Sequence, residues 1–217
     1  MSPSSRTSRL ARDFFDRDVH EVSRDLLGAR VSHDGVTVRI TEVEAYGGIG
    51  DPGAHAFRGK TPRNAVLFDR PGSLYVYFTY GMHFCSNLVA GPHGQGAAVL
   101  LRAGEVIDGE DRARERRDVP GKPPVPARDL ARGPARLAVT LGLSRPHNGL
   151  DTVAPDCPVL VSAPNGSVRG PVRTGPRVGV TGPGGDGDVY PWRYWLEGEP
   201  TVSAYRPGVL RKRRTRP

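Results

Sequence analysis

The sequence predicts an α+β fold, a single compact domain with a curved, mostly antiparallel sheet and few helices. Short segments alternate between apolar and polar residues, as strands with one buried face do. The chain contains 28 Gly and 21 Pro, enough to separate many short strands by turns. Its 217 residues suffice for one sizeable core, and no internal repeat is present.

The first 46 residues predict an arm, two short helices and a hairpin. Residues 1–9 are polar, and we expect them to form a disordered N-terminal arm. Helical pieces are predicted at 13–15 and 19–28, the second with an apolar stripe and a glycine at its end. Residues 29–46 then predict two strands around an Asp-Gly turn.

The middle of the chain predicts a long loop followed by a second hairpin. Residues 47–70 are polar, and a loop of this length in a compact domain is usually functional or disordered. Residues 74–80 alternate strictly and precede a partner strand at 82–90, which places Tyr80 at the hairpin tip. A further strand is predicted at 97–103.

The remaining elements are two helices and a series of short strands. Helices are expected over 105–117 and 130–143, with a proline-rich loop at 119–126 between them. The domain is expected to span 10–205 and to be followed by a basic tail over 206–217. The short strands are predicted at 159–162, 177–180, 192–196 and 201–204.

The net charge of +8 comes from the two ends of the chain. Residues 1–12 and 205–217 hold nine positive charges and no acid, which leaves a net charge of −1 on residues 13–204. Basic tails often bind polyanions, but a solvated tail without a role is an equally good interpretation. The charge alone therefore does not establish nucleic-acid binding.

The sequence contains no signal for secretion or membrane insertion. The N-terminus lacks an apolar segment, and no apolar run approaches the roughly 20 residues of a membrane span. Cys85 and Cys157 lie far apart and outside any CxxC pattern, so we interpret them as free buried thiols in a reducing compartment. We expect a soluble, cytoplasmic protein with no membrane partner.

The most informative part of the sequence is the predicted strand that ends at residue 46, because it carries acidic residues on an otherwise apolar face. Three β-branched residues are followed, on that face, by two carboxylates and a tyrosine. A carboxylate at the rim of an apolar region tends to have a raised pKa, which suits a general base. Glu44 is the first candidate, although a lone strand glutamate is usually a surface residue. The face consists of Val36, Val38, Ile40, Glu42, Glu44 and Tyr46.

Several other residues could carry chemistry or bind a ligand. His55 lies in a Gly/Pro-rich loop with no second His or Cys at ligand spacing, so we reject a metal site. Tyr80 at a hairpin tip exposes apolar area unless something covers it, and a base stack would do so. Arg102 follows an apolar run and needs an anionic partner or solvent.

The lysine content argues against covalent amine chemistry. The chain has three lysines and 28 arginines, and only Lys60 lies near the candidate residues. A Schiff base needs an amine whose pKa is depressed by its site, and Lys60 stands among polar loop residues. Chemistry by activated water is therefore favoured.

A series of short motifs resembles the alkyladenine DNA glycosylase (3-methyladenine DNA glycosylase) family in order and spacing. Any one motif would be weak evidence, but together they cover roughly residues 10–205. The matching segments are residues 41–46, 54–55, 61–64, 71–77, 80–82, 87, 99–103, 133–137, 141–143 and 176–180.

This resemblance implies a base-excision repair enzyme that acts on double-stranded DNA containing damaged purines. The enzyme would flip an alkylated or deaminated purine out of the duplex and hydrolyse its N-glycosidic bond, leaving an abasic site. Glu44 would activate the attacking water, and Arg102 and the backbone carbonyl of Val178 would help to hold it. The resemblance implies no cofactor and no metal, and it fits a monomer, associated with the nucleoid in a bacterium.

The resemblance also assigns residues to the base and to the duplex. Asn87 would disfavour normal guanine by crowding its exocyclic amine, and His55 would offer the base a backbone hydrogen bond. Tyr80 and Met82 would enter the duplex from a hairpin that protrudes at the DNA-binding face. The flipped base would be lined by Tyr46, His55 and Tyr77.

Two other functions remain open from the sequence. Glu42 and Glu44 could imitate the carboxylate pair of a glycosidase that acts on a small nucleoside or sugar. Such a substrate needs no wedge, so Tyr80 argues against this alternative. A non-catalytic lesion-binding protein is the second alternative, and it predicts that Glu44 is dispensable. The lesion spectrum itself is not fixed by the sequence.

Overall fold

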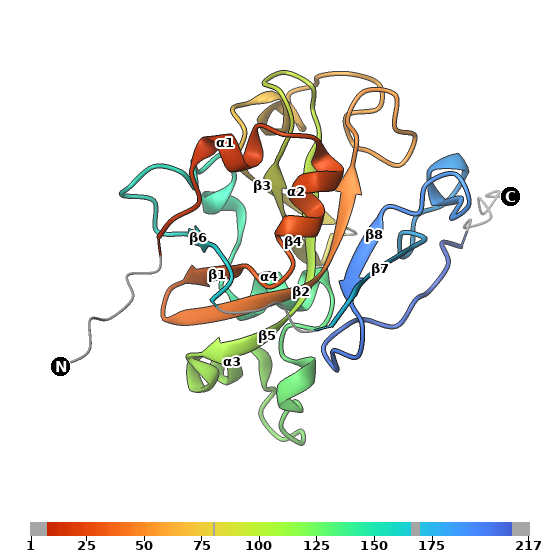
Figure 1. Cartoon of the computed structure of the whole chain (residues 1–217). Helices are drawn as coiled ribbons and strands as arrows, with labels where there is room; N and C mark the ends of the chain where they lie inside the picture. Colours follow the sequence, from red (N-terminus) through yellow and green to blue (C-terminus); the bar gives the residue numbers. More distant parts are fainter. Residues whose placement is uncertain (1–7, 80, 166–169, 210–217) are drawn as a thin grey trace, which may run out of the picture.

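The computed structural model describes residues 8–79, 81–165 and 170–209, and it has the predicted α+β fold with few helices (Figure 1). The helices are α1 (Arg12–Phe15), α2 (Val19–Asp25), α3 (Glu110–Arg117) and α4 (Pro134–Thr140). The strands are β1 (Arg30–His33), β2 (Val36–Tyr46), β3 (Leu74–Thr79), β4 (His83–Val89), β5 (Ala98–Asp108), β6 (Leu160–Ser162), β7 (Val172–Gly175) and β8 (Arg193–Leu196). Short 3₁₀ turns are η1 (Ala65–Phe68), η2 (Ala127–Asp129), η3 (Arg145–His147) and η4 (Pro183–Gly185).

The strands of the described ranges join in one antiparallel sheet of eight. Its order is β3-β4-β5-β2-β1-β6, with β8 and β7 branching from β2. The branch forms because β2 changes its outer partner along its length. It pairs with β1 up to Arg39 and with β8 from Glu42 to Glu44. Figure 1 shows β8 and β7 beside β2, at the right of the view.

The central pair, β2 and β5, is irregular where the two strands become polar. The register shifts between Ile40 and Glu42 and again between Glu42 and Val43. Such irregularities re-aim side chains, and they are common beside functional sites. Val38 and Ile40 join the apolar core before the shift, whereas Val43 joins it afterwards. The single uninterrupted face predicted for this strand is therefore broken at Thr41.

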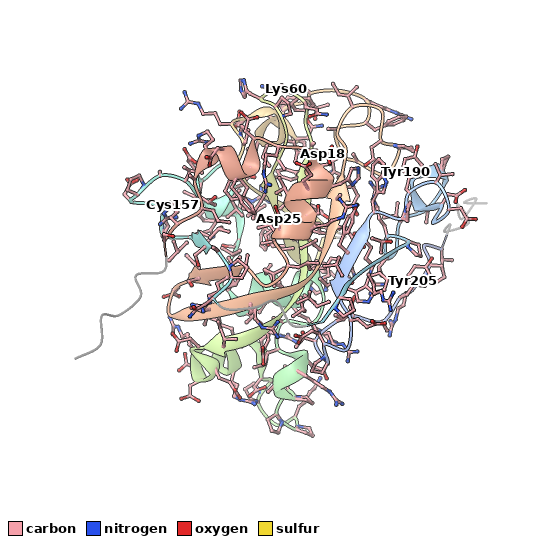
Figure 2. All side chains as sticks on the ribbon, viewed as in Figure 1. Asp18, Asp25, Lys60, Cys157, Tyr190 and Tyr205 are labelled. Atoms are coloured by element: carbon pink, nitrogen blue, oxygen red, sulfur yellow. The ribbon has the colours of Figure 1, made fainter. Side chains whose placement is uncertain are left out.

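The helices begin where the sequence supplies the right terminal residues. The Asp18 carboxylate accepts the N–H of His20 at 2.9 Å and so caps α2, and Figure 2 shows Asp18 and Asp25 near its two ends. Pro134 occupies the first turn of α4, where its missing N–H costs nothing. α2 packs on β2 and β5, while α4 packs on β4 and β5. Leu26, the C-cap residue of α2, and Leu137 of α4 are fully buried.

Three predicted elements of the second half are corrected by the structure. β5 continues to Asp108, because Val38 and Arg39 still pair with Val106 and Glu105, so α3 starts only at Glu110. No strand forms at 177–180 within the described chain, because Gly179 has a φ of +73° and turns the backbone.

The strand predicted at 201–204 is also absent from the described residues. The Ser203 N–H donates to the Glu42 carboxylate instead of to a neighbouring strand. The Thr201 hydroxyl contacts that of Thr41 at 2.8 Å. Side chains of β2 thus replace the backbone partner that a strand would need.

The structure tests the predictions for the two chain ends only in part, because it describes few of their residues. Most of the N-terminal arm and the basic tail beyond Val209 lie outside the described residues. Arg9, expected in the arm, forms a β-bridge with Ser162 and donates to three backbone carbonyls.

The two cysteines, predicted to be free and buried, are confirmed as free. Only Cys85 is buried, and Cys157 is partly exposed. None of the helices in the described ranges has the length and apolarity that crossing a membrane requires.

Candidate active site

A cavity of about 610 Å³ is lined by residues of strands β2, β3, β4 and β5 and by two loops. The loops contribute residues 52–55 and 178–181. The strands can share one cavity because β2 pairs with β5, β5 with β4, and β4 with β3. The cavity brings together seven residues singled out in the sequence: Glu44, Tyr46, His55, Tyr77, Asn87, Arg102 and Val178.

Glu44 is fully buried, and three donors surround its carboxylate. Oε1 accepts the backbone N–H of Val178 at 2.7 Å and lies 3.1 Å from Nη1 of Arg102. Oε2 accepts the Tyr46 hydroxyl at 2.8 Å. Burial and the neighbouring Glu44 charge raise the pKa of Tyr46, which keeps its hydroxyl a donor. The acid therefore sits in a polar network and not at the apolar rim that the sequence suggested.

The second carboxylate, Glu42, holds the arginine that contacts the first. Its Oε1 accepts Nε of Arg102 at 2.9 Å and Nε of Arg193 at 2.6 Å. Its Oε2 accepts the Ser203 N–H at 2.7 Å. Burial alone would lower the pKa of Arg102, but the charges of Glu44 and Glu42 outweigh it and raise the pKa. Arg102 is thus a fixed cation beside Glu44.

Aromatic rings form the opposite wall of the cavity. The Tyr75 and Tyr77 rings stack with centroids 5.4 Å apart, and the His55 ring meets Tyr77 edge-on at 4.5 Å. Packing around the His55 ring and, secondarily, the charge of Arg63 lower the pKa of His55. The ring is therefore neutral near pH 7, although part of it faces the open cavity. A flat, electron-poor ligand could lie against this wall.

Asn87 and Cys85 lie on β4, facing the tyrosines of β3. The Asn87 amide donates to the Tyr75 carbonyl at 3.1 Å, which fixes the direction of its side chain. Cys85 stands opposite Tyr77 in the hairpin, and burial raises the pKa of its thiol. Both side chains line the cavity and limit what fits there.

A buried ion pair behind the site was missed by the sequence reasoning. The guanidinium of Arg177 donates to Asp51 and is completely inaccessible to solvent. It also lies over the Tyr46 ring, 4.4 Å from its centroid. Asp51 accepts the N–H of Gly53, the geometry of an Asx turn. The Asp-Pro-Gly sequence signals that turn, but nothing in the sequence identifies the arginine 126 positions away.

Only one of the two predicted wedge residues, Met82, lies within the described part of the chain. Tyr80 lies outside the described residues. Met82, next to the β3–β4 tip, is 67% exposed and does not line the cavity. Phe78 is also exposed, and its ring packs on Phe84 at 4.9 Å. The hairpin thus carries apolar side chains that face solvent.

The geometry can hold a planar ring beside a buried carboxylate. An ionised acid near such a ring can accept a proton from water or stabilise a cation that forms beside it. In the described part of the chain, no three His, Cys, Asp or Glu residues are arranged to hold a metal ion.

Comparison with known proteins gives one consistent family. A family model described as methylpurine-DNA glycosylase matches residues 13–200. A Streptomyces avermitilis protein, provisionally named 3-methyladenine DNA glycosylase, is 50% identical over 95% of this chain and 96% of its own. Proteins with the same name from Leifsonia xyli and Mycobacterium tuberculosis are 49% and 45% identical, covering 95% and 83% of this chain and 97% and 86% of theirs. These matches confirm the resemblance found in the sequence.

Proposed function

The chain belongs to the methylpurine-DNA glycosylase family, and on this premise we propose that it is a monofunctional glycosylase with Glu44 as its general base. It flips an alkylated or deaminated purine out of double-stranded DNA and hydrolyses the N-glycosidic bond, which leaves an abasic site. The observation that carries this proposal is the position of Glu44, a buried carboxylate held by three donors inside an aromatic-walled cavity.

The chemistry requires an acid at this place for two reasons. Hydrolysis needs a base that takes a proton from water as the water attacks the sugar. The sugar also becomes cationic as the base leaves, and a fixed carboxylate stabilises that charge. Arg102 and the Val178 carbonyl hold the water in this proposal. Two observations support this role for Val178: its N–H donates to Glu44, and the residue lines the cavity.

The cavity wall suits a flipped purine. Tyr46, His55 and Tyr77 stack on the base, and a cationic alkylated purine gains most from electron-rich rings. Among the described residues, the backbone N–H of His55 donates to no protein acceptor, which leaves it free for the base. Asn87 crowds the position of the guanine amine and so disfavours the undamaged base.

The duplex is engaged outside the cavity. Tyr80 and the exposed Met82 enter the gap that the flipped nucleotide leaves. The basic tail over 206–217 adds contacts to phosphates. No lysine lines the cavity in the described ranges, and Lys60 is exposed on the outer loop (Figure 2), which favours water over an amine as nucleophile.

The proposal is tested by Glu44→Gln in single-turnover assays on duplexes that contain 7-methylguanine, hypoxanthine or ethenoadenine. We expect base release to fall by about 10²- to 10⁴-fold while the duplex is still bound. Glu105→Gln is the matched control, because Glu105 also pairs with an arginine of the sheet but lies away from the cavity. Undiminished release by Glu44→Gln, or wild-type activity on free nucleosides alone, would contradict the proposal.

A further inference from the structure

We propose that Arg177, together with Asp51, is a positioning residue that sets the direction of Glu44. This inference rests on the proposed function, because it assigns to the pair the orientation of the general base. The pair would act through two neighbours of Glu44, the Val178 N–H and the Tyr46 ring, and would not touch the substrate.

The guanidinium of Arg177 connects three segments of the fold. Nε donates to the Ala45 carbonyl at 3.0 Å, on β2 between Glu44 and Tyr46. Nη1 donates to Asp51 at 2.9 Å and to the Gly184 carbonyl at 3.1 Å, and Nη2 also donates to Asp51. A rigid planar group with these partners fixes the distances between β2, the Asp51 loop and the η4 turn.

The residue after Arg177 contacts Glu44, the proposed general base, directly. Val178 donates its N–H to Oε1 of Glu44 at 2.7 Å. This N–H belongs to the peptide that joins Val178 to Arg177, so a displacement of the Arg177 main chain would move the donor away from Glu44. The following residue, Gly179, donates its N–H to the Arg206 carbonyl at 2.8 Å, which holds the turn from its other side. The donor to Glu44 is thus held at both ends.

Asp51 connects the same junction to the aromatic wall. Its carboxylate accepts the N–H groups of Gly47 and Gly53, and the loop then reaches His55 in the cavity. A side chain at Gly53 would collide with the Arg177 guanidinium, so the loop passes directly against it. The Tyr46 hydroxyl donates to Glu44, and the Tyr46 ring lies under the guanidinium, with its centroid 4.4 Å from Cζ of Arg177.

Stability alone does not account for this pair. A buried ion pair can often be replaced by apolar residues without loss of stability, because desolvation of the charges costs about as much as their attraction returns. What an apolar pair cannot supply is donors that fix three backbone segments at set angles. Arg177 donates to the Ala45 carbonyl, next to Glu44 on β2, and directly precedes Val178, whose N–H donates to Glu44.

The test compares Arg177→Lys and Asp51→Asn with the wild type in two measurements. One is the single-turnover rate of hypoxanthine release from a duplex. The other is the affinity for a duplex whose lesion nucleotide carries a 2′-fluorine that blocks cleavage. We expect the rate to fall roughly tenfold to a hundredfold and the affinity to change by less than about threefold. Equal losses in rate and affinity, or no loss of rate in either variant, would overturn the inference.

Two further variants distinguish a positioning role of Arg177 from a purely structural role, and failure of this inference from failure of the proposed function. Arg116→Met is the matched control, because Arg116 is also a largely buried arginine, and it bridges Asp34 and the Thr140 carbonyl without lining the cavity. It should lower thermal stability without lowering the rate. Adding Arg177→Lys to Glu44→Gln should cause no further loss, because the pair acts through Glu44. A further loss in that double variant would contradict the inference, whereas full activity of Glu44→Gln alone would contradict the proposed function.

Discussion

The backbone N–H of Val178 donates to Oε1 of Glu44 at 2.7 Å, although the two residues stand 134 positions apart in the chain. β2 fixes the backbone of Glu44, but a glutamate side chain retains several rotamers on a strand. The Val178 N–H, Arg102 and the Tyr46 hydroxyl together select one of them. The direction of the candidate base therefore depends on the C-terminal third of the chain as much as on its own strand.

Glu42→Gln should weaken both the fold and the reaction. Glu42 accepts from Arg102, Arg193 and Ser203, all within 2.6–2.9 Å. Loss of its charge leaves two buried arginines with one carboxylate, which we expect to cost about 3–5 kcal/mol of unfolding free energy. Urea unfolding measures this cost. The single-turnover rate should also fall, roughly tenfold, because Arg102 loses the partner that aims it at Glu44.

The ion pair between Arg39 and Glu105, which is partly exposed, provides the comparison for the Glu42→Gln experiment. Glu105→Gln removes a half-exposed partner of Arg39 and should cost less than about 1 kcal/mol. If Glu42→Gln lost no more stability than Glu105→Gln, Glu42 would not be the anchor of Arg102.

The shared strand face of Glu44 and Tyr46 could be predicted from the sequence, because period-two strands show which side chains lie together, whereas the family resemblance alone assigned Tyr46 and Tyr77 to a base pocket. Tyr75 and Tyr77 alternate with apolar residues in a clear hairpin, and the structure places both on the cavity wall. The register shift at Thr41 could not be predicted, since it depends on the pairing of β2 with β5. Local pattern therefore identified the acids but gave them the wrong surroundings.

Long-range contacts account for the other omissions. Arg177 was expected in a strand, yet its side chain is withdrawn into a pair with Asp51 that no local period reveals. Ser203 was also expected in a strand, but its N–H is used by Glu42. In both segments a buried charged group makes a long-range contact, and single-sequence propensity contains no information on such contacts.

The lowered pKa of His55 predicts a binding profile that depends on the charge of the lesion. Packing around the ring, then the charge of Arg63, lowers this pKa, so the ring is neutral at pH 7 and gains a proton only at lower pH. The added charge would repel a cationic base. Affinity for 7-methylguanine DNA should fall at least about fivefold between pH 7 and pH 5, and affinity for neutral hypoxanthine DNA should fall less.

This profile is measured by fluorescence anisotropy with Glu44→Gln, so that no base is released during the titration. His55→Gln, added to that variant, should bring the two lesions to the same pH dependence. A difference that persisted without His55 would assign the effect to another group.

Residues 210–217, the outer part of the basic tail, should act on salt dependence, and residues 206–209 on the reaction. Residues 210–217 carry five positive charges, and each phosphate contact they make should steepen the salt dependence of DNA binding by about 0.9 in the log–log slope. Ending the chain after Val209 should therefore flatten the slope and leave the single-turnover rate unchanged.

Ending the chain after Tyr205 should have a second effect that the shorter deletion lacks. It removes the Arg206 carbonyl, which accepts the Gly179 N–H at 2.8 Å and so supports the turn that holds Val178 against Glu44. We expect the rate at saturating enzyme to fall roughly tenfold in this deletion alone. Comparing the two deletions at low salt, where both bind DNA fully, separates the electrostatic role of the tail from the support of the site. Equal rates would show that Gly179 keeps its position without Arg206, and the turn would then depend on Arg177 alone.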